Sequence, residues 1–187
     1  MHRILNISAF FCALGLLFSS TAMGFDIRKP VSKEVFLGYG QDSTLKNNDE
    51  EYVHFTAALD LSYPFAEAGM WRNFQFQLEP FLSFVASPGD NAEIGCVFFI
   101  KYTLPLNFPV KPYLRGGSGV ILLTQETEEQ STLFNFASQM GYGLSCETKD
   151  IDIFVEYRNR HVSNASIKHP NDGLDSYIWL LGIRGLF

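Results

Sequence analysis

The sequence predicts an all-β protein, an eight-stranded antiparallel up-and-down transmembrane β-barrel, and three observations support this prediction. Apolar and polar residues alternate with a period of two over most of the chain, and turn-forming clusters recur at the spacing of short antiparallel strands. Apolar residues make up 47% of the chain and aromatic residues 15%, which is high for an acidic protein. After the N-terminal segment, no apolar run approaches the roughly 20 residues that a transmembrane helix needs.

The N-terminal 24 residues have the features of a secretory signal peptide. Arg3 gives a short basic start, an apolar core runs from Ile7 to Phe18, and small residues precede the expected cleavage site. A membrane anchor helix is the alternative, but the apolar core is short for a span of roughly 20 residues. We therefore expect a signal peptide over residues 1–24 and a single barrel domain over residues 25–187.

Eight segments of the expected mature chain have the alternating pattern of a strand, and eight is the smallest strand number of bacterial outer-membrane barrels. These segments are 33–41, 51–62, 74–86, 92–104, 110–123, 132–146, 150–162 and 174–187. With both chain ends in the periplasm, the outer loops are 42–50, 87–91, 124–131 and 163–173. The segment 63–73 is longer than a periplasmic turn needs, and it carries no functional interpretation.

The alternation also predicts which face meets the membrane. In the second segment Val53 and Phe55 share one face, whereas His54 and Thr56 share the other. A soluble sandwich or a lipocalin-like barrel would point its large apolar residues to a core and cover its outer face with charges. The set opposite the apolar residues here is mostly Gly, Gln, Ser, Glu and Arg, which is too small and polar for such a core. We therefore expect apolar side chains outside and polar ones in the lumen, with Pro80 as an irregularity in its strand.

The acidic charge argues against one class of partner, the polyanions. The formal net charge is −6 and the pI is near 5.1, so a nucleic-acid-binding role is not expected.

A histidine, a serine and a carboxylate lie at the outer end of the last expected hairpin. His161 and Ser163 have the parity of the outward-facing Tyr157, and Asp175 has the outward parity of the last strand. If His161 pairs opposite Asp175, their Cβ atoms are about 5 Å apart. A serine hydroxyl becomes a nucleophile when an imidazole, itself oriented by a third group, takes its proton. Ser163, His161 and Asp175 could fill these roles on the outside of the barrel, although such residues in a loop are often only solvated.

Two other groups of residues have simpler explanations. Glu156, Arg158 and Arg160 have lumen parity and are expected to form an interior ion network. The run Gly116–Gly119 superficially resembles a nucleophile elbow, but Val120 stands where a glycine would be expected, and the context is a strand.

The segment HVSNASIKHPNDGLDSY, residues 161–177, resembles the lipid A 3-O-deacylase family. Members of this family are PagL-like outer-membrane enzymes that remove one ester-linked acyl chain from lipopolysaccharide. The resemblance is close over residues 157–187, and it rests on H-x-S-N-A, a following P-N-D-G and a carboxylate at a fixed offset. Elsewhere it extends only to size, signal peptide and strand count.

The resemblance implies a role for each site residue. His161 would be the base, Ser163 the nucleophile and Asn171 an oxyanion donor, together with backbone amides near Ala165 and Ser166.

One position departs from the family pattern, since the third member of the triad is usually glutamate and here it is Asp175. The shorter side chain requires either that the two strands of the hairpin come closer together or that the imidazole is held less well, which would lower turnover.

The resemblance further implies that no metal or organic cofactor is needed. It implies lipid A of lipopolysaccharide as substrate and the bacterial outer membrane as location, and it allows a homodimer.

Two alternatives stay open at this point. One is a non-catalytic small outer-membrane barrel with a structural or adhesive role, in which Ser163 could be replaced without effect. The other is an esterase that acts on different outer-leaflet lipids. A degenerate family member with little activity would also fit the aspartate at position 175.

Overall fold

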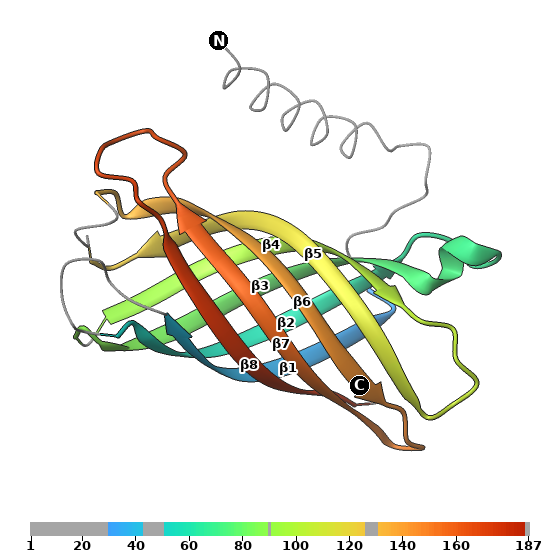
Figure 1. Ribbon diagram of the computed structural model, residues 1–187. Helices are drawn as coiled ribbons and strands as arrows, with labels where there is room; N and C mark the ends of the chain where they lie inside the picture. Colours follow the sequence, from blue (N-terminus) through green and yellow to red (C-terminus); the bar gives the residue numbers. More distant parts are fainter. Residues whose placement is uncertain (1–29, 43–50, 90, 126–130, 186–187) are drawn as a thin grey trace, which may run out of the picture. The chain divides into compact units, whose positions relative to one another are not determined.

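The computed structural model describes residues 30–42, 51–89, 91–125 and 131–185. Eight antiparallel strands close into one barrel, with β1 to β8 arranged in sequence order (Figure 1). The predicted fold class is therefore confirmed. The expected signal peptide lies outside the described residues, and the compact unit that forms the barrel begins at Val31.

The strands coincide closely with the segments expected from the alternation, and each end lies within two residues of its expected position. They are β1 (Ser32–Asp42), β2 (Val53–Pro64), β3 (Phe74–Ser87), β4 (Asn91–Thr103), β5 (Val110–Leu123), β6 (Phe134–Cys146), β7 (Ile151–Ser163) and β8 (Leu174–Gly185). The segment before β3 contains a short 3₁₀ helix, η1 (Met70–Asn73). No helix within the described ranges is long and apolar enough to cross a membrane.

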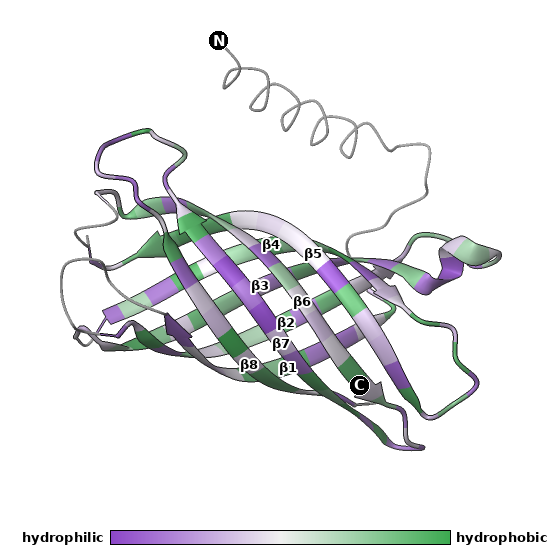
Figure 2. Cartoon of the chain, in the orientation of Figure 1, coloured by the Kyte–Doolittle hydropathy of each residue, from purple (hydrophilic) through white to green (hydrophobic). Residues whose placement is uncertain are grey.

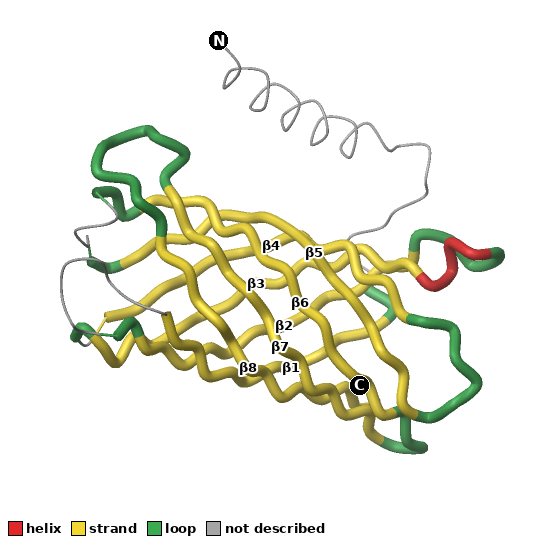
Figure 3. Tube along the Cα trace, in the orientation of Figure 1, coloured by secondary structure: helices red, strands yellow, loops and turns green. Residues whose placement is uncertain are grey.

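Each strand pairs with its sequence neighbours, and the barrel closes where β1 pairs with β8 from Val35 opposite Ile183 to Asp42 opposite Ser176. Because the strands are antiparallel and in sequence order, β1, β3, β5 and β7 all end at the same end of the barrel, which is the expected extracellular end (Figure 3). The β7–β8 connection, residues 164–173, is described throughout and rises above that end.

The outer wall is apolar. Large apolar side chains alternate outward along the strands, among them Leu37, Leu82 and Trp179, each more than half exposed. Figure 2 shows the resulting alternation of hydrophobic and hydrophilic residues along the strands. This orientation confirms the expected arrangement and suits a wall that contacts lipid.

The lumen contains the expected ion network. Arg115 pairs with Asp60 at 2.5 Å, with Glu79 at 3.0 Å and with Glu156 at 2.8 Å. Arg158 pairs with Glu79 at 2.6 Å and with Glu156 at 2.8 Å. All five side chains are buried, so each charge depends on the others for compensation.

The lumen is less uniformly polar than the sequence suggested. Phe36, Phe99 and Phe154 are fully buried inside it, and the guanidinium of Arg115 lies 4.6 Å from the ring centroid of Phe99. The interior of an eight-stranded barrel is narrow enough that side chains must fill it. Aromatic rings supply that volume and at the same time contact the cations through their faces.

Pro80 remains within β3, opposite Cys96 of β4. On the other side, the β2–β3 register passes from Ala58–Phe81 to Leu61–Leu78 without pairing Pro80. A missing N–H explains this local gap, because proline cannot donate to the neighbouring strand.

Candidate active site

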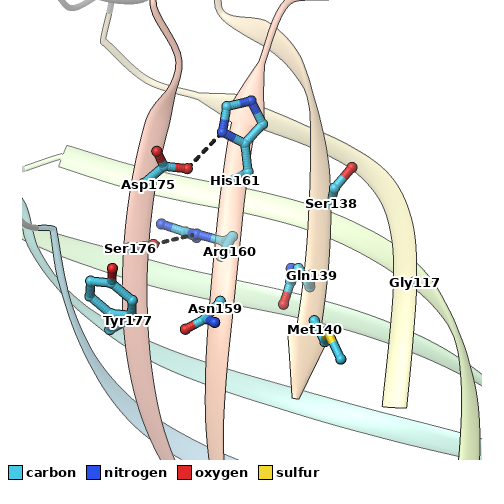
Figure 4. A pocket seen from close by; sticks show the side chains of 10 residues that line it. All are labelled: Gly117, Ser138, Gln139, Met140, Asn159, Arg160, His161, Asp175, Ser176 and Tyr177. Atoms are coloured by element: carbon cyan, nitrogen blue, oxygen red, sulfur yellow. Dashed lines mark hydrogen bonds and ion pairs between the residues drawn. The ribbon is translucent and has the colours of Figure 1, made fainter.

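His161 and Asp175 face outward from adjacent strands at the extracellular end. They are direct register partners between β7 and β8, and Nδ1 of His161 lies 2.7 Å from Oδ1 of Asp175 (Figure 4). An ionised carboxylate can only accept a hydrogen bond, so Nδ1 carries the proton in this pair. The other ring nitrogen, Nε2, is then the one that can accept a proton from a hydroxyl.

Ser163 ends β7 two residues beyond His161, on the same outward face and opposite Phe136 of β6. Its hydroxyl makes no hydrogen bond to the described residues, His161 included. Alternate residues of a strand are about 6.6 Å apart, and an imidazole that reaches along the strand can bridge much of that gap. Catalytic hydrogen bonds often form fully only with substrate bound. The structure thus joins His161 to Asp175 directly and leaves Ser163 next to them on the same face.

The chain after Ser163 turns sharply at two residues in the left-handed region. Ala165 has φ 54° and Ser166 has φ 64°, and the N–H of Ile167 donates to the carbonyl of Asn164 at 3.1 Å. Positive φ at two successive central residues is the pattern of a type I′ turn, and it is costly for residues other than glycine. Within the described part of the chain, the N–H groups of Ala165 and Ser166 have no hydrogen-bond partner, so both are available as donors.

Asn171 holds this turn through its side chain. Its Oδ1 accepts the N–H of Asn164 at 2.8 Å, which leaves its Nδ2 without a partner among the described residues. The buried Asn164 side chain donates to the carbonyl of Lys168 at 2.8 Å, and the Ser131 hydroxyl donates to the carbonyl of Pro170 at 3.0 Å. The β7–β8 connection is therefore tied to itself and to the connection before β6.

Gly173 packs against the imidazole, a contact that the sequence did not reveal. It has φ +86°, and a Cβ at this position would lie 2.6 Å from Cε1 of His161. Glycine suits this position because it tolerates the positive φ, and a Cβ here would push the ring aside. The glycine belongs to the P-N-D-G motif, but its contact with His161 depends on the path of the connection.

Two serines continue the row of outward side chains on the other side of His161. Ser138 of β6 is the register partner of His161, and Ser118 of β5 is the register partner of Ser138. The two hydroxyl oxygens are 3.2 Å apart. Sequence reasoning missed both. The alternation in the sequence predicts that both side chains face outward. Their position beside His161 follows only from the register between β5, β6 and β7.

A hollow of about 380 Å³ lies on the outer wall at this row and below it (Figure 4). The outward side chains that line it are Ser138, His161, Asp175, Met140, Asn159 and Tyr177. Further from the rim, Tyr157 contacts Tyr142, Tyr177 and Trp179 with ring centroids 4.9–6.0 Å apart. Such an aromatic group is typical of the level where a barrel crosses the membrane interface. No group of three or more potential ligands in the described ranges could hold a metal ion.

The residues directly behind the pair form a lumen network. Arg160 and Ser176, the neighbours of His161 and Asp175, are register partners, and Nε of Arg160 donates to the Ser176 hydroxyl at 3.0 Å. The same guanidinium binds Glu93 of β4 through both carboxylate oxygens, at 2.6 and 3.1 Å. The Tyr52 hydroxyl also donates to Glu93 at 2.6 Å. These contacts connect β7 to β8 from inside, which confirms the expected interior position of Arg160.

Comparison with known families decides what this barrel is. The family model described as lipid A 3-O-deacylase (PagL) matches residues 36–184. The chain belongs to the lipid A 3-O-deacylase family. The crystal structure of the outer membrane enzyme PagL has the same fold, with a TM-score of 0.65 and 17% identity over 80% of this chain and 97% of that one.

A second solved structure shares the fold under a different name. Neisserial surface protein A (NspA) matches with a TM-score of 0.60 and 14% identity, over 83% of this chain and 96% of that one. Because one fold can carry unrelated functions, the family match rather than the barrel identifies the activity. No curated protein matches the sequence significantly.

The protein is thus an outer-membrane hydrolase that acts on lipid A as a 3-O-deacylase, as the sequence predicted. The family match speaks against the non-catalytic barrel. The homodimer that the resemblance allows stays a prediction, as do the catalytic roles of the individual residues.

Proposed function

We propose that this lipid A deacylase is a serine esterase in which Ser163 is the nucleophile, His161 the general base and Asp175 the group that orients the imidazole. The observation that carries the proposal is the 2.7 Å contact between Nδ1 of His161 and Oδ1 of Asp175 on the lipid-facing wall. It fixes the tautomer in which Nε2 can take a proton from a hydroxyl. Ser163, two residues further along the same face, is the hydroxyl at the position required by the H-x-S motif.

The reaction would proceed in two steps. Oγ of Ser163 attacks the carbonyl carbon of the 3-O-linked ester while Nε2 of His161 takes the hydroxyl proton. The tetrahedral intermediate then collapses, the bond to the sugar oxygen breaks, and His161 returns the proton to that oxygen. Water, deprotonated by His161, next attacks the acyl-serine, releasing the fatty acid and restoring Ser163.

The negative charge of the tetrahedral intermediates needs hydrogen-bond donors close to Ser163. The N–H of the following residue, Asn164, is already occupied by Oδ1 of Asn171. That same bond holds the Asn171 side chain beside the nucleophile, with its Nδ2 available. The N–H groups of Ala165 and Ser166 are the other candidate donors in this turn, whose strained backbone is consistent with a functional role.

The aspartate in place of the family's glutamate fits this arrangement. Because Asp175 is the direct register partner of His161, even the shorter side chain spans the gap between the strands. We therefore expect an active enzyme rather than a degenerate one.

The position of the three side chains suits a substrate that stays in the membrane. They face the bilayer next to the Tyr157 aromatic group, near the level at which ester bonds join acyl chains to the sugar of a lipid. The acyl chain could remain against the apolar wall below the hollow while its ester is cleaved.

Mass spectrometry of lipid A from cells that produce each variant tests the proposal. Wild-type protein should remove one 3-hydroxy fatty acid from lipid A, whereas Ser163→Ala and His161→Ala should leave lipid A intact. Ser83→Ala, which removes a lumen hydroxyl bonded to Thr56, is the matched control and should retain activity. All variants must first be shown to reach the outer membrane as folded barrels. Deacylation by folded Ser163→Ala at the wild-type level would refute the assignment.

A further inference from the structure

The Ser118–Ser138 pair adds a second polar feature to the outer wall, next to the outward side chains of His161 and Asp175. Both side chains face outward, and their only hydrogen bond within the described residues joins their own hydroxyls at 3.2 Å. Each serine has one O–H donor, and only one of the two is used in that bond. The pair therefore has one donor and several lone pairs left over, and these can bind a ligand at the outer wall.

The chemistry of the pair indicates a neutral ligand. Among the described residues that line the hollow, the one Lys or Arg is Arg160, and it turns its buried guanidinium inward to Glu93. Two hydroxyls without a cation favour an uncharged group that both donates and accepts, and an alcohol fits this better than a phosphate.

The distances limit where such an alcohol could lie on the substrate. Ser163 is opposite Phe136, so Ser138 is its diagonal neighbour across the β6–β7 pair. Diagonal neighbours are about 7–8 Å apart. A hydroxyl two carbons from an ester carbonyl held at Ser163, with a hydrogen bond of about 2.8 Å, can span that separation.

We propose that Ser138, supported by Ser118, binds a hydroxyl group on carbon 3 of the acyl chain that the enzyme removes. The pair is then a specificity determinant beside the reactive centre and takes no part in bond making. This inference rests on the proposed function of Ser163, because the reach is measured from the nucleophile. Ser118 holds the Ser138 hydroxyl in place and leaves it able to donate to and accept from the substrate alcohol.

Two synthetic glucosamine esters test this inference if their 3-O-acyl chains differ only by a hydroxyl on carbon 3. The measured quantity is the ratio of kcat/KM for the hydroxylated chain to that for the plain chain. Wild-type protein in detergent or lipid should prefer the hydroxylated chain. Ser138→Ala should lower the ratio about three- to tenfold, the range expected for loss of one neutral hydrogen bond. Ser118→Ala should lower it less, and Ser138→Thr, which keeps a hydroxyl, should restore most of it.

Ser83→Ala again serves as the matched control and should leave the ratio unchanged, because its hydroxyl lies in the lumen. An unchanged ratio in folded Ser138→Ala would overturn the inference. Loss of hydrolysis of both esters in that variant would also overturn it, since it would make Ser138 part of the reaction itself. Failure of the proposed mechanism would look different, because Ser163→Ala would then still hydrolyse both esters.

Discussion

The imidazole of His161 is fixed by two contacts of different kinds. Asp175 binds Nδ1 through a hydrogen bond of 2.7 Å, and the backbone of Gly173 covers the ring so closely that a Cβ would reach 2.6 Å from Cε1. The carboxylate sets the tautomer and the glycine limits the positions that the ring can occupy. Such positioning matters because a displacement of about 1 Å in an active site can cost 100-fold in rate.

At the scale of the residue, Gly173→Ala should lower kcat for lipid A deacylation roughly 10- to 100-fold, because the added Cβ displaces the imidazole. Gly69→Ala is the matched control. Gly69 also has a positive φ, +74°, but a Cβ there would meet no atom within 4 Å. Rates measured on equal amounts of folded protein would separate ring displacement from backbone strain. Equal losses in both variants would contradict this role for Gly173.

At the scale of the element, the last hairpin is supported from inside the barrel. Arg160 joins β7 to Ser176 of β8 and to Glu93 of β4, directly behind the outward pair. The network therefore connects the strands that carry His161 and Asp175 to the opposite side of the lumen. A rigid strand pair is a better support for a catalytic group than a loop is.

Arg160→Ala should destabilise the barrel by about 3–5 kcal/mol, because it leaves Glu93 buried without its cation. The double variant Arg160→Met with Glu93→Leu should recover most of that loss. Lys111→Ala breaks a partly exposed pair with Glu147 and should cost less than about 1 kcal/mol. Urea unfolding in lipid vesicles, followed by tryptophan fluorescence, measures all three. If Arg160→Ala were as stable as the wild-type protein, Arg160 would not stabilise the last hairpin from inside the barrel.

At the scale of the whole molecule, the barrel inverts the arrangement of a soluble protein, with apolar residues outside and charges inside. This inversion is what allows a hydrolytic site to face lipid directly. The lipid-facing position of the wall makes it sensitive to charge, and the cost of a cation is greatest near the bilayer midplane.

Leu82, in the middle part of β3 and 57% exposed, tests that orientation. Leu82→Arg should lower the free energy of unfolding in lipid vesicles by about 2–4 kcal/mol. Leu82→Ala removes the same apolar side chain without adding charge and should cost distinctly less. If the two variants were equally stable, the outward face of β3 would not contact the hydrocarbon.

Strand positions and side-chain parity could be predicted because period-two alternation and turn residues are local signals. The pairing of His161 with Asp175 was also accessible, since a hairpin restricts the register of its two strands. The position of Ser138 beside His161 could not be predicted, because it depends on the register between β6 and β7. The buried Phe99 was missed because parity gives the direction of a side chain but not the volume that the lumen must fill. The positive φ of Ala165 has no sequence signal, since alanine rarely adopts it.

The central claim is that Ser163 is the hydroxyl activated by His161, and a serine-reactive phosphonate tests it most directly. Folded protein in detergent or lipid is treated with the reagent, and the modified peptide is identified by mass spectrometry. We predict a single modification at Ser163 that persists in Ser138→Ala and disappears in His161→Ala. Modification at Ser138 instead, or labelling of Ser163 that does not depend on His161, would contradict the account.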